Sequence, residues 1–234
     1  MATDHPGNQW RGLARRRQIW LPTWRGCLLL ACLAGLGAWV LLHALYPFLA
    51  VSAPVPGGVM VLEGWMPDAS LRAAVEEYRR GHYQRLYITG GPITQGGPLS
   101  LYKTFPELAG AVLLKMGMNS NEMVIVPAPG VARDRTYTSG IYLTRWWRSH
   151  QVEVTRVNLV SVGPHARRSR LMFEQALGPG VQVGVTALPP LDFNPDRWWR
   201  TSEGFRTVTS EAIAYLYARF FFRTPRAADL PPVP

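Results

Sequence analysis

The sequence predicts an α/β domain in which a mostly parallel sheet of about five strands lies between two helical layers, preceded by one transmembrane helix. Short apolar runs alternate with segments of helical periodicity between residues 59 and 222. This alternation, punctuated by Gly and Pro, is typical of parallel sheets with helices on both faces. We therefore divide the chain into a basic segment (1–25), a transmembrane helix (26–51), a linker (52–58), the α/β domain (59–222) and a disordered tail (223–234).

The transmembrane helix is predicted from a run of 26 residues, Gly26 to Val51, that contains no Asp, Glu, Lys or Arg. About 20 residues suffice to cross the bilayer core. A secretory signal peptide is the alternative, since small residues follow at 50–53. However, the run is too long, and Pro54 would follow the favoured cleavage point. We expect an uncleaved anchor.

The distribution of arginines predicts the orientation of this anchor. Arg15, Arg16, Arg17 and Arg25 precede the apolar run, whereas no basic residue follows it until Arg72. By the positive-inside rule, the amino end is cytoplasmic and the α/β domain lies on the far side of the membrane.

Composition excludes several function classes. The net charge is +10, of which residues 1–50 supply +4 (five Arg minus Asp4), so the remaining 184 residues carry only +6 and no nucleic-acid partner is expected. Cys27 and Cys32 both lie in the apolar run, which leaves no disulfide framework and no zinc site. The chain has no HExxH motif, dinucleotide fingerprint or P-loop, so we expect neither a metal nor a cofactor.

The elements of the domain follow from apolar periodicity and turn residues. The run Val59 to Leu62 is typical of a strand buried on both faces. The last helix carries an apolar stripe (Ile213, Leu216 and Phe220), which we expect to cover the sheet, with contact to the bilayer as the alternative. The expected strands are 58–62, 86–89, 122–126, 157–162 and 181–185, and the expected helices are 67–80, 99–116, 136–149, 165–176 and 201–222.

Candidate site residues follow the strands, because ligands bind parallel α/β sheets at the carboxyl ends of the strands. The turns selected by this rule are Glu63-Gly64-Trp65, Thr89-Gly90-Gly91, Arg133 to Thr136, and Gly163-Pro164-His165. Exposed N–H groups at Gly90 and Gly91 would allow close approach of an anion, although a tight turn explains the same glycines.

His165 is the most informative of these residues. It opens a predicted helix, and Arg168 lies one turn later on the same face. Together with the helix amino end, the two side chains would hold a phosphate or carboxylate. His165 is also the candidate general acid or base. In the alternative, His165 caps a carbonyl and the neighbouring arginines form a solvated face.

The remaining candidates have structural alternatives of their own. Thr136 and Ser139 open a helix, where hydroxyls cap the backbone or bind ligand oxygens, and Arg135 adds positive charge. Glu63 ends a buried strand, where a carboxylate needs a partner. Arg72 is the candidate partner, and the two residues either form a structural pair or belong to the ligand site.

The order of these segments resembles the YdcF-like family of envelope proteins, which includes SanA and ElyC. The resemblance covers about residues 57–222. It rests on Leu86 to Gly91, Arg135 to Ser139, and the spacing Ser161-x3-His165-x2-Arg168-Ser169. The family usually has Asn-Thr-x-Glu-Asn after the third strand, and this chain keeps only the Thr.

The resemblance implies a Rossmann-like domain anchored in a bacterial inner membrane, with the domain periplasmic or otherwise extracytoplasmic. It also implies a role in envelope biogenesis, permeability or cell-wall precursor handling, with no reaction to carry over. We therefore expect binding of an anionic small molecule or a polyprenyl-phosphate-type ligand, with hydrolase or transferase chemistry left open. The alternative is a non-enzymatic scaffold or regulator that binds other envelope proteins.

Overall fold

The computed structural model describes residues 21–94, 96, 99–225 and 231. The chain divides into two compact units, residues 1–41 and 42–234. In the first unit, the described residues belong mostly to helix α1 (Trp24–Leu49), which is long and apolar enough to cross a membrane. The arginines at positions 11–17 and most of the expected tail lie outside the described residues.

The second unit contains a five-stranded sheet in which every neighbouring pair is parallel, with the strand order β3-β2-β1-β4-β5. The expected strands are all present. They are β1 (Val59–Glu63), β2 (Leu86–Gly90), β3 (Met123–Pro127), β4 (Arg156–Val162) and β5 (Gln182–Leu188).

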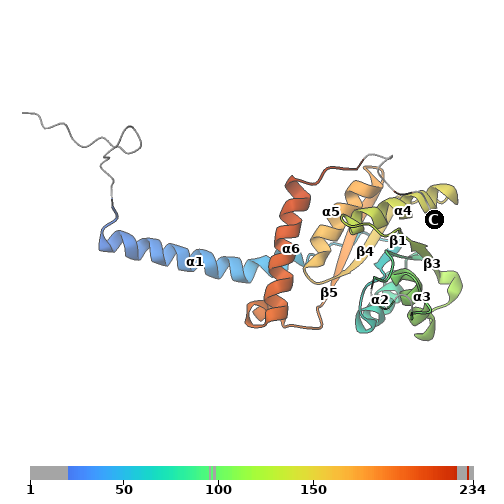
Figure 1. The fold of residues 1–234 in the computed structure, drawn as a ribbon, viewed down its shortest axis with the longest axis horizontal. Coiled ribbons are helices and arrows are strands. Elements are labelled where there is room, and N and C mark those ends of the chain that lie inside the picture. The colour runs from blue at the N-terminus through green and yellow to red at the C-terminus, as the bar shows by residue number, and fades with distance from the viewer. Residues whose placement is uncertain (1–20, 95, 97–98, 226–230, 232–234) are drawn as a thin grey trace, which may run out of the picture. The chain divides into compact units, whose positions relative to one another are not determined.

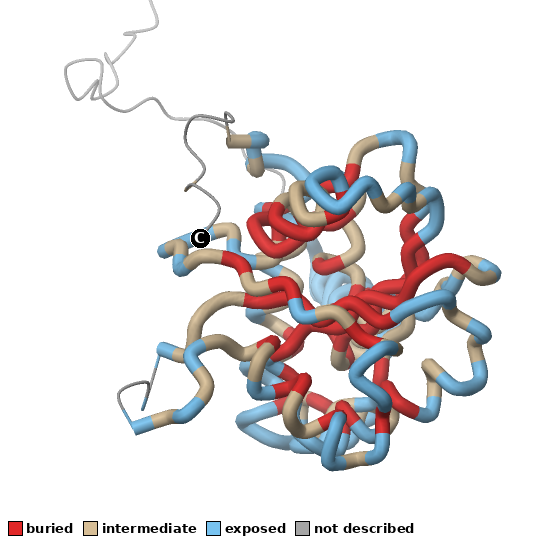
Figure 2. Tube along the Cα trace, turned by 90° about the vertical axis from the view of Figure 1, so that its right-hand side faces the viewer, coloured by how far each residue is buried: buried red, intermediate tan, exposed pale blue. Residues whose placement is uncertain are grey.

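Helices cover both faces of the sheet, which confirms the predicted α/β class (Figure 1). The helices α2 and α3 pack on one face, and α4 and α5 on the other. The backbone is most deeply buried along the sheet between these layers (Figure 2). The helices are α2 (Asp68–Arg80), α3 (Phe105–Lys115), α4 (Arg135–Ser149), α5 (His165–Leu177) and α6 (Ser202–Phe220), with short 3₁₀ helices η1 (Ser120–Glu122) and η2 (Pro195–Arg200).

The alternation of side chains along β1 decides which helical layer each residue faces. Met60 and Leu62 pack in the core beneath α2 and α3, whereas Val59 and Val61 pack in the core beneath α4 and α5. Glu63 has the same parity as Val59 and Val61. Its carboxylate is therefore directed to the layer that contains α5.

Helix α3 begins at Phe105, so its predicted start at residue 99 is wrong. The Thr104 hydroxyl accepts a hydrogen bond from the backbone N–H of Glu107, and the Glu107 carboxylate accepts one from the backbone N–H of Thr104. This capping box, with Pro106 in the first turn, fixes the amino end of the helix.

The expectation that the last helix buries its apolar stripe is also wrong. Ile213, Leu216 and Phe220 are 69%, 52% and 70% exposed. Helix α6 packs against α5 and η2 through the other side, which carries Val208 and Ala218. The packed residues of α6 are Val208, Ala212, Tyr215 and Ala218, and the stripe is left exposed.

Candidate functional site

The strand order places a switch point of the sheet between β1 and β4. The chain runs from β1 outward to β2 and β3, then returns to the other side of β1 for β4 and β5. Crevices at such points bind ligands in open α/β sheets. The two segments that meet there are Glu63, at the end of β1, and the turn from β4 into α5, which carries His165.

Glu63 is only 4% exposed, and its carboxylate is fully engaged. It accepts hydrogen bonds from Ser161 Oγ at 2.6 Å and from Ser169 Oγ at 3.1 Å. His165 Nε2 lies 3.5 Å from Glu63 Oε1. Burial alone would raise the pKa of Glu63, but the charge and hydrogen bond of His165 and the Ser161 hydroxyl hold that pKa below its ordinary value.

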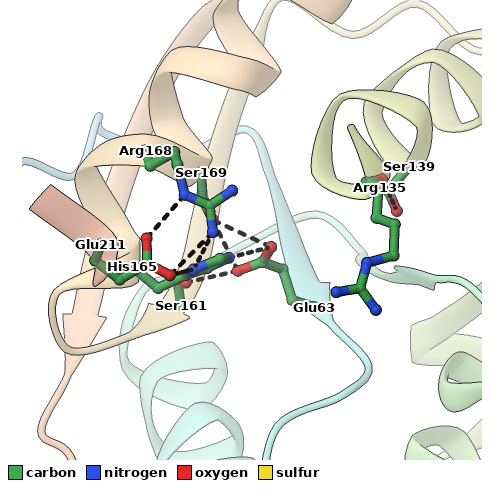
Figure 3. A network of polar contacts seen from close by, with 8 residues as sticks. All are labelled: Glu63, Arg135, Ser139, Ser161, His165, Arg168, Ser169 and Glu211. Atoms are coloured by element: carbon green, nitrogen blue, oxygen red, sulfur yellow. Dashed lines mark hydrogen bonds and ion pairs between the residues drawn. The ribbon is translucent and has the colours of Figure 1, made fainter. Parts of the chain in front are cut away.

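His165 lies between two carboxylates. Its Nδ1 is 2.8 Å from Glu211 Oε1, on α6, while its other nitrogen faces Glu63 (Figure 3). Burial opposes the charged ring, but the two carboxylates outweigh that effect and raise the pKa of His165 to about 9. The ring is therefore mostly protonated at neutral pH, and Arg168 Nη2 lies 2.9 Å from the same Nδ1.

Arg168 completes this group by binding the same α6 carboxylate. Its Nε donates to Glu211 Oε2 at 2.8 Å and its Nη2 donates to Oε1 at 3.0 Å. Burial would raise the pKa of Glu211, but hydrogen bonds from His165 and Arg168, and their charges, lower it to about 2. The two cations are thus balanced by two carboxylates within what we call the His165 network: Glu63, His165, Arg168 and Glu211.

A cavity of about 610 Å³ lies beside the His165 network and contains most of the predicted site residues. The predicted residues among its lining are Glu63, Thr89, Arg135, Thr136, His165 and Arg168. The opposite wall is formed by the turn before α4 and its first residues, from which Arg135 lies across the site from His165 (Figure 3).

Arg133 and Arg135 differ from Arg168 in that both are exposed. Neither forms an ion pair with any residue in the described part of the chain. We call these two the arginine wall. Asp134 lies between them in the chain and also lines the cavity, so the three residues carry a net charge of +1 (two Arg minus one Asp) without a direct ion pair, unlike the His165 network.

Two predicted residues lie away from the cavity. Arg72 is exposed on α2, and the prediction that it pairs with Glu63 is wrong, because His165, Ser161 and Ser169 occupy that carboxylate. The Ser139 hydroxyl donates to the Arg135 carbonyl oxygen at 3.1 Å, within its own helix.

The paired glycines do not line the cavity either. Gly90 is buried with φ +153°, and its carbonyl oxygen accepts the N–H of Ala128 at 2.8 Å. A Cβ at Gly90 would lie 3.4 Å from Pro106 Cδ. Gly90 therefore serves the tight turn after β2, the structural alternative considered for it. Thr89, which precedes the two glycines, does line the cavity.

The main residue that sequence reasoning missed is Glu211. It stands on α6 opposite the apolar stripe, and only the docking of α6 on α5 brings it to His165. Ser161 and Ser169 were part of the spacing that carried the family resemblance, but no role was predicted for them. The roles of Glu211, Ser161 and Ser169 depend on contacts with residues on other elements, so they could be recognised only once the packing of those elements was known.

Comparison with models of known families, with curated proteins and with solved structures found no match to this chain. Within the described residues, no group of three or more His, Cys, Asp or Glu side chains is arranged to hold a metal ion. The fold and site therefore define an α/β protein with a switch-point cavity that combines one internally balanced wall with one cationic wall.

Proposed function

We propose that this is a YdcF-like protein of the bacterial cell envelope that binds an anionic small molecule or a lipid-linked cell-wall precursor in the switch-point cavity. Helix α1 is proposed as its anchor in the inner membrane, with a cytoplasmic amino end and an extracytoplasmic α/β unit. The observation that carries the binding proposal is the arginine wall, whose charge has no carboxylate partner among the described residues and faces the His165 network across the cavity.

The structure changes how the anion would be held. His165 and Arg168 already bind Glu211, so most of their charge is compensated. Arg133 and Arg135 remain, and Arg135 begins helix α4, whose free N–H groups and dipole favour an anion at that end. Two guanidinium groups and a helix amino end suit a phosphate, which accepts several charge-assisted hydrogen bonds.

Any group transfer in this cavity would use His165 as a general acid through Nε2, which is 3.5 Å from Glu63, because Nδ1 is held by Glu211 at 2.8 Å. The imidazolium with a pKa of about 9 is protonated at neutral pH, so it can donate a proton to a leaving group or stabilise a developing negative charge. It is poorly suited to act as a base. Thus, within the proposed function, His165 donates a proton to the ligand and does not accept one from it.

The binding proposal is tested with the full chain in detergent, by following thermal unfolding in the presence of inorganic phosphate, sugar phosphates, nucleotides and polyprenyl phosphates. A ligand at a hundredfold excess over its Kd stabilises the folded state by about 2.7 kcal/mol. We expect this gain to disappear in the double variant Arg133→Ala/Arg135→Ala.

Arg148→Ala is the matched control, because Arg148 is exposed on the same helix and lines none of the cavities described here. It should keep the full gain. If no phosphate compound stabilises the wild-type chain, the binding function is wrong and the non-enzymatic scaffold remains.

The proposed topology has a separate test. A phosphatase reporter that is active only outside the cytoplasm is fused after Phe222. Activity is expected if the α/β unit is exported, and an inactive but stably produced fusion would overturn the orientation.

A further inference from the structure

A second cavity, of about 520 Å³, lies on the other side of His165 and Glu211. Trp65, His165 and Glu211 line both cavities, so these three side chains form the boundary between them. The ring of Trp65 meets that of His165 edge-on, with centroids 5.2 Å apart. A ligand that enters both cavities would therefore pass over Trp65 and His165.

The lining of the second cavity differs from that of the first. Half of its lining is apolar, contributed by the turns after β1, β4 and β5, and its polar half carries one arginine, Arg206, together with Asp192. Its apolar residues besides Trp65 are Pro67, Val162, Pro164, Pro190, Leu191 and Phe193. Leu191 is 54% exposed, so its side chain is accessible to a ligand.

A further contact indicates where this cavity lies. The ring of Phe193 packs edge-on against Tyr46, near the carboxyl end of α1, with centroids 6.1 Å apart. The cavity thus adjoins the last turns of α1, residues 42–49, which belong to the same compact unit as the sheet.

We propose that the second cavity binds an apolar chain attached to the anionic group that occupies the first cavity. The inference rests on the proposed function and makes the ligand an amphiphile, with its phosphate at the arginine wall and its hydrocarbon against Leu191 and Phe193. A soluble phosphate would fill only one of the two cavities.

The test compares n-alkyl phosphates from methyl to hexyl, below their aggregation concentrations, on the full chain in detergent. Affinity is measured from the shift in thermal unfolding. Each methylene group that becomes buried is expected to tighten binding about fourfold, whereas methyl phosphate reports on the first cavity alone. Sugar phosphates are measured in parallel, because aromatic walls also accept sugars.

Leu191→Asp is expected to abolish the dependence on chain length while leaving methyl phosphate binding unchanged. Leu216→Asp is the matched control, because Leu216 is 52% exposed and lines neither cavity. It should retain the dependence.

The outcomes separate this inference from the proposed function. Binding of methyl phosphate without any effect of chain length overturns the inference and leaves anion binding intact. A chain-length effect that persists in Leu191→Asp, or tighter binding of sugar phosphates than of hexyl phosphate, also overturns it. If no phosphate binds at all, both proposals fail together.

Discussion

The two walls of the first cavity both carry cationic side chains, but those of one wall form ion pairs and those of the other do not. On one side, His165 and Arg168 are mostly buried and held by Glu63 and Glu211 at short distances. On the other side, Arg133 and Arg135 are exposed and have no ion-pair partner in the described residues. A buried cation needs a carboxylate partner within the protein, whereas an exposed cation is solvated by water and remains available to bind a ligand. The same residue types therefore serve structure on one wall and are available for binding on the other.

The largest expected effect comes from removing a carboxylate of the His165 network. Glu63→Ala leaves the imidazolium without one partner and two serine hydroxyls without an acceptor, and it should lower the free energy of unfolding by about 3–5 kcal/mol. Denaturant unfolding of the full chain measures this change. Glu76→Ala, an exposed residue of α2, should stay within about 0.5 kcal/mol of wild type. A loss below about 1 kcal/mol for Glu63→Ala would show that this wall is not a structural unit.

His165 and Glu211 should make stability depend on pH in two ranges, with effects no larger than that of Glu63→Ala. The pKa of His165 rises from 6.5 to about 9 on folding, so its contribution is complete below pH 6.5 and is lost as the pH rises through 9. The pKa of Glu211 falls from 4.5 to about 2, so its contribution is complete above pH 4.5 and is lost as the pH falls through 2. Each limb should amount to on the order of 3 kcal/mol, because each pKa differs by about 2.5 between the unfolded and folded states.

Thermal unfolding across pH checks this, with His165→Gln flattening the alkaline limb. His82→Gln, at an exposed position, should leave the limb in place. If the limb survives in His165→Gln, another group is responsible for it.

The smallest expected effect lies on the arginine wall. Without ligand, Arg133→Ala/Arg135→Ala should change the free energy of unfolding by no more than about 0.5 kcal/mol, because exposed side chains without partners contribute little. The same unfolding measurement gives the answer. A loss of 2 kcal/mol or more would mean that these arginines have a structural partner, and the contrast between the walls would no longer hold.

The sequence was sufficient for the strands, the layers and the edge at which the site lies. Apolar runs such as Val59 to Leu62 report burial directly, and the rule for parallel sheets then selects the turns that carry Glu63 and His165. The partners of these residues could not be predicted in the same way. Arg72 is close to Glu63 in sequence but exposed in the structure, whereas Glu211 is remote in sequence and contacts His165.

The fate of α6 illustrates the same limit. Its apolar stripe predicted a buried face, but the opposite face, which carries Val208 and Ala218, packs against α5 and η2. That packing brings Glu211 to His165. Periodicity alone could not rank the two faces.

The division of His165's counter-charges between the first strand and the last helix also bears on how the protein is made. A nascent chain that has emerged only as far as α5 holds Glu63 and the imidazole but not Glu211. The ring acquires its second carboxylate only when translation has delivered α6. A product truncated before residue 211 therefore retains the sheet sequence without a finished cavity.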